Sequence, residues 1–277
     1  MKKTIVITSM ILLGGLTLIS CSQESQIADG LEGSTGYLSL NLNTENIFSI
    51  NSSPASSRSV QESSYANVDN YTVVVLDKDG IEKMNCKGSE IASKMPIAMP
   101  IGSCEVRAYY GTESAASRDA FYVYGKSIGT IKADQNVSLS VACSPTCGRV
   151  SVAFSPEMST YYTDYKVSFS GTQALSDNTI EWLKEDSEPW YIQLASTGET
   201  VSFTITVTTK DEYINADNKE KVTSKSGTFN LTRNKAYKLK ISPVYTASGT
   251  GDMTLDISID ASTIDKECDI EVPVDWI

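Results

Sequence analysis

Apolar and polar residues alternate with a period of two along most of this chain, which is the pattern of half-buried β-strands. Near its start, Leu38, Leu40 and Leu42 alternate with small polar residues. The same alternation returns at residues 104–110, 137–143, 150–154, 165–169, 201–207, 229–231, 237–241, 253–259 and 270–276. A period of 3.6 residues is almost absent, and only residues 178–184 are expected to hold a helical turn. The pattern therefore predicts an all-β fold.

The segments between these strands carry turn and loop signals. An apolar run over residues 71–76 ends in Asp-Lys-Asp-Gly at residues 77–80, which predicts a hairpin turn. An EF-hand loop needs its glycine at position six rather than four, so we do not expect calcium there. Residues 49–64 are rich in serine and are predicted to form an exposed loop.

The strand count also predicts the domain organisation. Short strands at this spacing, about seven in each half, are typical of β-sandwiches. We therefore predict two tandem sandwich domains, at residues 36–147 and 148–277, joined near residues 143–148.

The N-terminus has the organisation of a bacterial lipoprotein signal. A basic start precedes an almost wholly apolar or small run at residues 4–19, which is too short and too interrupted by glycine for a membrane span. The run ends in Leu-Ile-Ser-Cys, similar to a lipobox, in which the cysteine sulfur takes the lipid and a small residue precedes the cut. We predict a signal peptide at residues 1–20, a lipid anchor at Cys21 and a flexible tether over 21–35. The alternative is an ordinary secretory signal followed by a chance cysteine.

Composition and charge narrow the functional classes. The 277 residues include 23 Lys and Arg against 34 Asp and Glu, for a net charge of −11. Such an acidic surface repels phosphate backbones, so we expect no nucleic-acid partner. The sequence contains no histidine, which excludes histidine-based triads, histidine metal sites and the usual imidazole base. We therefore expect neither an enzyme nor a cofactor.

Five cysteines remain beside Cys21, an odd number that leaves at least one thiol unpaired in a monomer. They are Cys86, Cys104, Cys143, Cys147 and Cys268. The Cys143–Cys147 pair has a Cys-x₃-Cys spacing, whereas a redox motif needs Cys-x-x-Cys and a zinc knuckle needs a second pair of ligands. We expect no metal and either buried or locally bridged thiols. An exported compartment permits a disulfide, but the pairing stays open.

Several strand-and-turn motifs occur in a fairly specific order. They are GYLSLNL at residues 36–42, DNYTVVVLDKDG at 69–80, MPIGSCEVRAYYG at 99–111, NVSLSVAC at 136–143 and VSVAFS at 150–155. Together they resemble a family of Bacteroidetes surface lipoproteins classed as a domain of unknown function, related to the fimbrillin and fimbrial-anchor (Mfa-like) superfamily. The resemblance covers most of residues 36–260.

The resemblance implies two Greek-key, transthyretin-like β-sandwiches and a lipid-anchored, outward-facing place on the outer membrane. Related pilins polymerise by strand exchange, in which a protease cuts after an arginine in the loop following the first strand and a neighbour's C-terminal strand fills the groove. On this interpretation residues 36–43 are a removable edge strand and Arg58 is the candidate cleavage site. The candidate donor strand carries Ile270, Val272, Val274 and Trp276. The alternatives are a bystander arginine in a loop and an ordinary closing strand.

Two functional classes follow from these features. The first is a structural or adhesive cell-surface lipoprotein, with a minor fimbrial component as its most specific form; its partners are the membrane, other fimbrial subunits or surface ligands. The alternative is a glycan-binding surface lipoprotein, suggested by exposed aromatic residues, of which each adjacent pair supplies at most one outward ring per face. These are Tyr109, Tyr161, Tyr162, Trp190 and Tyr191. The carboxylate pairs Glu181/Glu185 and Asp211/Glu212 are not distinguished from solvated charges, so hydrolysis is not predicted.

Overall fold

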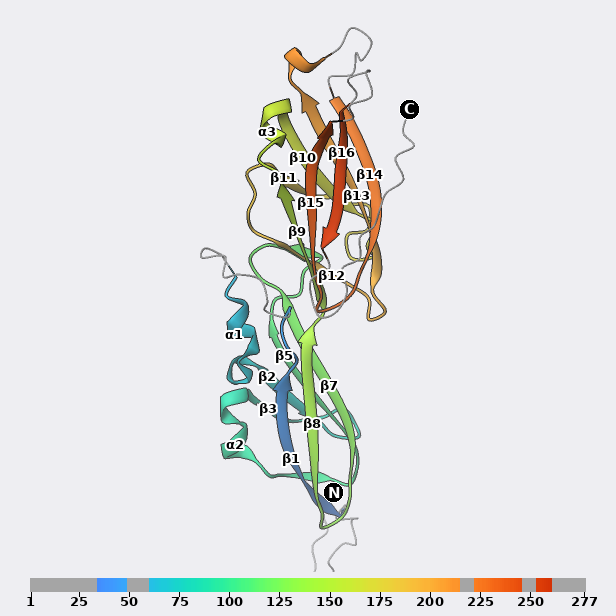
Figure 1. Ribbon diagram of the computed structural model, residues 1–277. Helices are drawn as coiled ribbons and strands as arrows, with labels where there is room; N and C mark the ends of the chain where they lie inside the picture. Colours follow the sequence, from blue (N-terminus) through green and yellow to red (C-terminus); the bar gives the residue numbers. More distant parts are fainter. Residues whose placement is uncertain (1–33, 49–59, 215–221, 246–252, 261–277) are drawn as a thin grey trace, which may run out of the picture. The chain divides into compact units, whose positions relative to one another are not determined.

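The computed structural model describes residues 34–48, 60–214, 222–245 and 253–260, and these are mostly β-strands (Figure 1). The strands are β1 (Thr35–Thr44), β2 (Thr72–Leu76), β3 (Glu82–Lys87), β4 (Ile97–Pro100), β5 (Gly102–Gly111), β6 (Ala116–Ser117), β7 (Tyr122–Ile131), β8 (Asn136–Pro145), β9 (Cys147–Phe154), β10 (Tyr162–Ser170), β11 (Ile180–Leu183), β12 (Trp190–Gln193), β13 (Glu199–Thr209), β14 (Val222–Leu231), β15 (Ala236–Tyr245) and β16 (Met253–Asp260). The helices are α1 (Glu62–Ala66), α2 (Ile91–Lys94) and α3 (Met158–Tyr161), with 3₁₀ turns η1 (Val68–Asn70), η2 (Gly88–Glu90) and η3 (Asp211–Tyr213). No described helix is long and apolar enough to cross a membrane. The predicted all-β fold is confirmed.

The two halves of the chain repeat one pairing scheme. In the first half, β2 pairs antiparallel with β3 and β5, β5 pairs with β7, and β1 pairs parallel with β8 and antiparallel with β4. In the second half, β10 pairs with β11 and β13, β13 pairs with β14, and β9 pairs parallel with β15 and antiparallel with β12. Two strands lie outside the scheme, since β6 pairs with β12 and β16 pairs with β15. In each half, therefore, the first strand lies beside a strand far away in sequence.

Two groups of buried side chains form the hydrophobic core. The first is centred on β1 to β8 and includes Leu38, Val73 and Val106, and the second is centred on β9 to β15. Most of the strands bury one face, which is the packing of a β-sandwich, whereas the start of β9 and the middle of β12 are buried on both faces. The first group also includes Tyr191 and Ala236 from the second half, and the chain from Ser34 onward forms one compact unit. The division into two domains at residue 147 therefore stays a prediction.

The predicted hairpin turn after β2 is confirmed. Gly80 has a φ of +75°, a left-handed conformation that glycine adopts without a steric penalty. The Asp77 carboxylate accepts hydrogen bonds from the backbone N–H groups of Asp79 and Ile81, both at 2.9 Å. Because this carboxylate closes the turn, β2 leads directly into β3.

The loop predicted over residues 49–64 ends earlier than expected. Val60 and Glu62 are buried, and residues 62–66 form α1. The side chain of Tyr65 is also buried because its ring stacks on Phe121, with 3.8 Å between the ring centroids. Within the described residues 60–64 of the predicted exposed loop, Val60 and Glu62 are thus buried while Gln61 and Ser63 are exposed.

The helical turn expected over residues 178–184 is also wrong. This segment contains the strand β11, which pairs antiparallel with β10. Trp182 is buried while its neighbours Glu181 and Leu183 are exposed, which is a period of two rather than 3.6.

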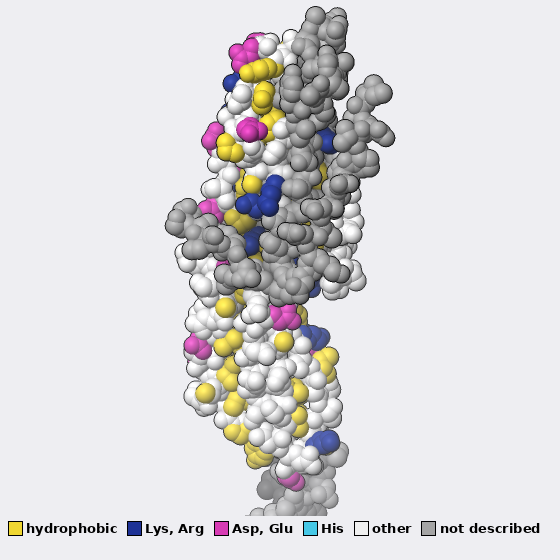
Figure 2. Space-filling model, in the orientation of Figure 1, with side chains coloured by type: hydrophobic (Ala, Val, Ile, Leu, Met, Phe, Trp, Pro, Cys, Tyr) yellow, Lys and Arg dark blue, Asp and Glu magenta, His cyan; other side chains and the backbone are white. Residues whose placement is uncertain are grey.

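The exposed surface of the described residues carries no single large apolar patch on the face drawn in Figure 2, where yellow side chains are scattered among white ones. The large apolar residues that are exposed come from different strands and turns. They are Tyr37, Ile81, Ile101, Ile128, Leu183, Tyr213 and Val222. Scattered exposed apolar residues of this kind are normal for a protein surface.

Candidate functional site

The first strand, β1, is held between two other strands at its beginning and by one along the rest of its length. Residues 35–38 pair with β4 on one side, and residues 37–44 pair with β8 on the other. The prediction that residues 36–43 form an edge strand is therefore wrong for residues 36–38. It is right for residues 39–43, where β8 is the only strand partner among the described residues.

The leucines of β1 bury one row of side chains, as the alternation predicted. Leu38 is fully buried, and Leu40 and Leu42 are half-buried against the same core group. Removing β1 would uncover this row and separate β4 from β8. Burying a leucine contributes about 2 kcal/mol, so an empty slot of this kind favours occupation by another apolar strand.

The end of β1 is anchored by Phe48, whose side chain is completely buried. Its ring centroid lies 5.2 Å from that of Phe121 and 5.6 Å from that of Tyr191, and the Arg149 guanidinium lies 5.4 Å from the ring. The Phe48 backbone N–H donates to Asn234 Oδ1 at 2.9 Å, and Asn234 Nδ2 donates to the carbonyl of Asn46 at 2.8 Å. We call this group of Phe121, Arg149, Tyr191 and Asn234 the Phe48 socket.

Glu62 completes the socket from the other end of residues 49–59. Its carboxylate accepts hydrogen bonds from Arg149 Nη1, at 2.8 and 2.9 Å, and from the Tyr191 hydroxyl, at 2.7 Å. Glu62 and Arg149 are 9% and 8% exposed, so this is a buried ion pair. A buried charge is tolerated only when it is paired and hydrogen-bonded, and each of these charges has such a partner.

Each candidate residue for processing and assembly lies outside the described residues. Cys21 and Arg58 fall at 1–33 and 49–59. The donor residues Ile270, Val272, Val274 and Trp276 fall at 261–277, as does Cys268. These assignments stay predictions. The described residues on either side of Arg58, Phe48 and Glu62, both belong to the site described above.

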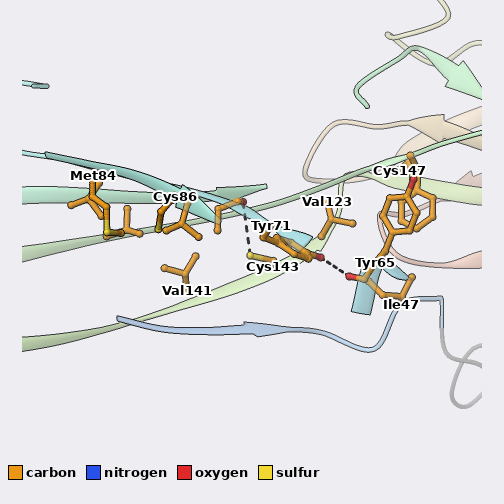
Figure 3. Close-up of a cluster of buried hydrophobic side chains, with 14 of the residues drawn as sticks. Ile47, Tyr65, Tyr71, Met84, Cys86, Val123, Val141, Cys143 and Cys147 are labelled. Atoms are coloured by element: carbon orange, nitrogen blue, oxygen red, sulfur yellow. Dashed lines mark hydrogen bonds between the residues drawn. The ribbon is translucent and has the colours of Figure 1, made fainter. Parts of the chain in front are cut away.

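The other four cysteines are free thiols buried in the first core group. Figure 3 shows Cys86, Cys143 and Cys147 within this cluster, where the Cys143 thiol donates to the carbonyl of Ala108 at 3.9 Å. Burial raises the pKa of Cys143 to about 12 and raises the pKa of Cys86, Cys104 and Cys147. A protonated, buried thiol is a poor nucleophile and metal ligand. Within the described ranges no group of Asp, Glu or Cys is arranged to hold a metal ion.

The aromatic pairs proposed for sugar stacking are only partly exposed. One ring of each adjacent pair, Tyr162 and Tyr191, is buried in the core, and Tyr161 is half-buried. This agrees with the expectation of at most one outward ring in each pair. Trp190 is half-buried, and the Arg118 guanidinium lies 4.5 Å from its ring. Tyr109 is half-buried on the outer face of β5.

Arg118 belongs to a cluster that the sequence analysis did not identify. Its guanidinium lies over both Trp182 and Trp190 and donates to Asp186 Oδ2 at 2.5 Å. The hydrogen bond from Arg118 is the main reason why the pKa of Asp186 lies below its ordinary value; partial burial opposes it. Because Arg118 directly follows β6, the cluster fixes that strand against β11 and β12.

The carboxylates considered for hydrolysis do not form a site. Glu181, Glu185, Asp211 and Glu212 are all exposed. The Glu181 carboxylate is paired with Lys166 at 2.5 Å. Acid–base chemistry of the glycosidase type needs one carboxyl in a protected setting, which these exposed groups lack.

The family of the chain follows from a comparison with known domains. A family model described as "Domain of unknown function (DUF4493)" matches residues 34–274. The chain belongs to this family. The resemblance seen in the sequence, to a family of unknown function, is confirmed.

Several solved structures also match, at low identity. One is the fimbrial anchor protein Mfa2 from Porphyromonas gingivalis, with 12% identity, a TM-score of 0.39, and coverage of 81% of this chain and 98% of that one. Another is a fimbrial assembly protein from Parabacteroides distasonis, with 11% identity, a TM-score of 0.38, and coverage of 82% and 98%. At these values the likeness assigns no function. No curated protein matches the chain.

The residues that sequence analysis missed are Phe48, Glu62 and Arg149, and Tyr191 was considered only for sugar stacking. One signal was present, since Arg149 is a cation between Gly148 and Val150 in an apolar strand and requires a buried partner. The identity of that partner could not be read from the sequence, because Glu62 lies 87 positions away.

Proposed function

We propose that this protein is a non-enzymatic structural or adhesive component of the bacterial cell surface, and that it joins other subunits by exchange of β-strands. The observation that carries the proposal is the position of β1. It is the first described strand, it buries a row of leucines, and it fills a slot between β8 and β4. A slot of this form suits strand addition, in which main-chain hydrogen bonds supply affinity and alternate side chains fill pockets.

In this proposal the mature chain is attached to the outer membrane by lipid on Cys21. The support is the apolar run at residues 4–19 with Ser20 before the cysteine. Changing Cys21→Ala is expected to abolish labelling by an alkyne fatty acid fed to the cells, whereas Cys86→Ala leaves it unchanged. Undiminished label on the Cys21→Ala protein contradicts the anchor.

Assembly then follows a cut after Arg58. The cut separates the segment that contains β1 from the rest of the chain. Residues 268–277 of a neighbour, with Ile270, Val272, Val274 and Trp276 on one row, then replace β1 in the slot. Pro273 lies on the opposite row and removes one main-chain donor, so the pairing has one bond fewer.

Limited trypsin treatment followed by native gels tests this step. Cut protein is expected to form ladders that survive mild detergent. The pair Val272→Ser and Val274→Ser should remove the ladders, and the matched pair Glu271→Ser and Asp275→Ser on the opposite row should keep them. Cut protein that stays monomeric, or ladders that persist without residues 268–277, contradict strand exchange.

A second candidate function, glycan binding, is favoured by one observation. Tyr109, Tyr122 and Tyr124 lie together on the outer face of β5 and β7, with ring centroids 6.1 Å apart for the first two and 6.3 Å apart for the last two. Aromatic rings of this kind pack against apolar faces of ligands while their hydroxyls hydrogen-bond. Binding on a glycan array that is lost with Tyr122→Ser and kept with Tyr37→Ser would establish this function instead.

A further inference from the structure

Residues 48 and 62 flank the segment 49–59, and both contact the same two side chains. Arg149 places its guanidinium over the Phe48 ring and pairs with the Glu62 carboxylate. Tyr191 contacts the Phe48 ring and donates its hydroxyl to the same carboxylate. The two flanks are therefore linked by their contacts with Arg149 and Tyr191 as well as by the covalent chain.

The backbone of Phe48 shows that these contacts decide its conformation. Its φ is +43°, a left-handed value that is unfavourable for a bulky residue. Such a conformation persists only where the surroundings over-determine it. Here the surroundings are the pocket of the fully buried ring, the hydrogen bond from the Phe48 N–H to Asn234, and the one from Asn234 to the Asn46 carbonyl.

We infer that the Phe48 socket is a retention site for β1, which holds that strand on the protein without a covalent link after the chain is cut between residues 48 and 60. Its occupant is residues 46–48 of the same chain, with Phe48 as the aromatic anchor. Glu62 lies on the C-terminal side of any such cut, so it keeps Arg149 and Tyr191 in place while the N-terminal fragment stays or leaves.

The consequence is that a cut in this segment does not by itself release β1. Release requires withdrawal of the Phe48 ring and loss of the two hydrogen bonds to Asn234, in addition to the pairing with β8 and β4. If the strand-exchange proposal holds, an incoming strand must compete with this occupant. The inference does not require that proposal, because it concerns only the departure of the first strand.

The test uses the full chain in detergent, with residues 52–58 replaced by the recognition sequence of a site-specific protease and an affinity tag after Ile277. The cut protein is immobilised through the tag, and the amount of N-terminal fragment that remains is followed over time. Truncating a buried phenylalanine weakens an equilibrium by about a hundredfold or more. Phe48→Ala is therefore expected to shorten the retention half-life by about a hundredfold, and Tyr37→Ala, an exposed aromatic on the same strand, by less than about threefold.

Two further measurements separate retention from misfolding and from assembly. The uncut Phe48→Ala protein should show the same far-UV spectrum as the parent, and Asn234→Ala should shorten retention in the same direction with the ring intact. The inference is overturned if Phe48→Ala and Tyr37→Ala fragments leave at the same rate, or if the parent fragment leaves as fast as the Phe48→Ala fragment. Ladders play no part in this readout, so a failure of strand exchange leaves it interpretable.

Discussion

Removal of the Glu62 carboxylate is the perturbation whose effect on stability the structure specifies best. In Glu62→Ala, the Arg149 guanidinium loses a carboxylate at 2.8 Å and the Tyr191 hydroxyl loses its acceptor at 2.7 Å. Both side chains are less than a tenth exposed, so water cannot readily replace the lost partner.

The expected loss can be worked from the burial of the pair. Breaking a buried ion pair by removing one partner typically costs about 3–5 kcal/mol, because an uncompensated charge stays in the interior. For a chain of this size, 1 kcal/mol lowers the melting temperature by about 2–4 °C. Glu62→Ala is therefore expected to lower it by roughly 6–20 °C.

The assay is thermal unfolding for the melting temperature and urea unfolding for the free energy, both followed by tryptophan fluorescence, with a double-mutant cycle. Arg149→Met added to Glu62→Ala removes the uncompensated charge, so the double variant should recover most of the lost free energy of unfolding. The matched control is Glu181→Ala, which breaks an exposed pair with Lys166 and should cost less than about 1 kcal/mol.

Two results would refute this reasoning. One is a Glu62→Ala protein that loses no more stability than Glu181→Ala. The other is a double variant whose loss equals the sum of the two single losses, because additivity means that Glu62 and Arg149 do not interact.

Three other predictions concern single features. The described thiols should resist a maleimide in the native protein at pH 8 and react in urea, since burial raises the pKa of Cys143 to about 12; labelling in the native state contradicts this burial. Gly111→Ala should lower the melting temperature more than Gly80→Ala. Both positions have a positive φ, +89° and +75°, but only at Gly111 would an added Cβ also clash, 1.9 Å from the Phe121 carbonyl oxygen; equal losses contradict this. Asp186→Asn should destabilise the protein at neutral pH. The difference in stability between the variant and the parent should shrink as the pH falls below about 4 and then through the lowered pKa of Asp186. In that range Asp186 of the parent becomes protonated, so the parent also loses the charged partner of Arg118. A difference in stability that does not change with pH contradicts this.

Strands could be predicted from the sequence where the side chains that point into the core are apolar. The rows that begin at Leu38, Cys104, Val150 and Val201 were all placed correctly, since alternation alone defines a half-buried strand. The strand β7 was missed because its inward row contains Gly125 and Gly129. A Cβ at Gly125 would lie 2.6 Å from Cys143 Sγ, and one at Gly129 would lie 2.7 Å from a Leu139 methyl group. Close packing requires glycine at these two positions. Because glycine has no apolar side chain, the alternating pattern that identifies a strand is absent from this part of the sequence.

The socket could not be predicted because its parts are distant in sequence and ordinary in composition. Phe48 and Glu62 border a serine-rich segment, which indicates a loop, and Tyr191 follows a tryptophan in a pattern typical of exposed aromatics. Only the fold brings β9 and β12 together, and with them Arg149 and Tyr191. The repeat of the pairing scheme was equally hidden, since it is a repeat of topology without a short sequence period.

The most direct test of the proposed function places a photo-crosslinking amino acid at the position of Trp276 in cells and maps the crosslinked peptides. Mixing chains of two isotopic compositions distinguishes crosslinks between copies from crosslinks within one chain. The strand-exchange account predicts crosslinks from position 276 of one copy to residues 136–145 or 97–100 of another, which border the slot of β1. Crosslinks confined to the same chain, or none to these strands, would contradict it.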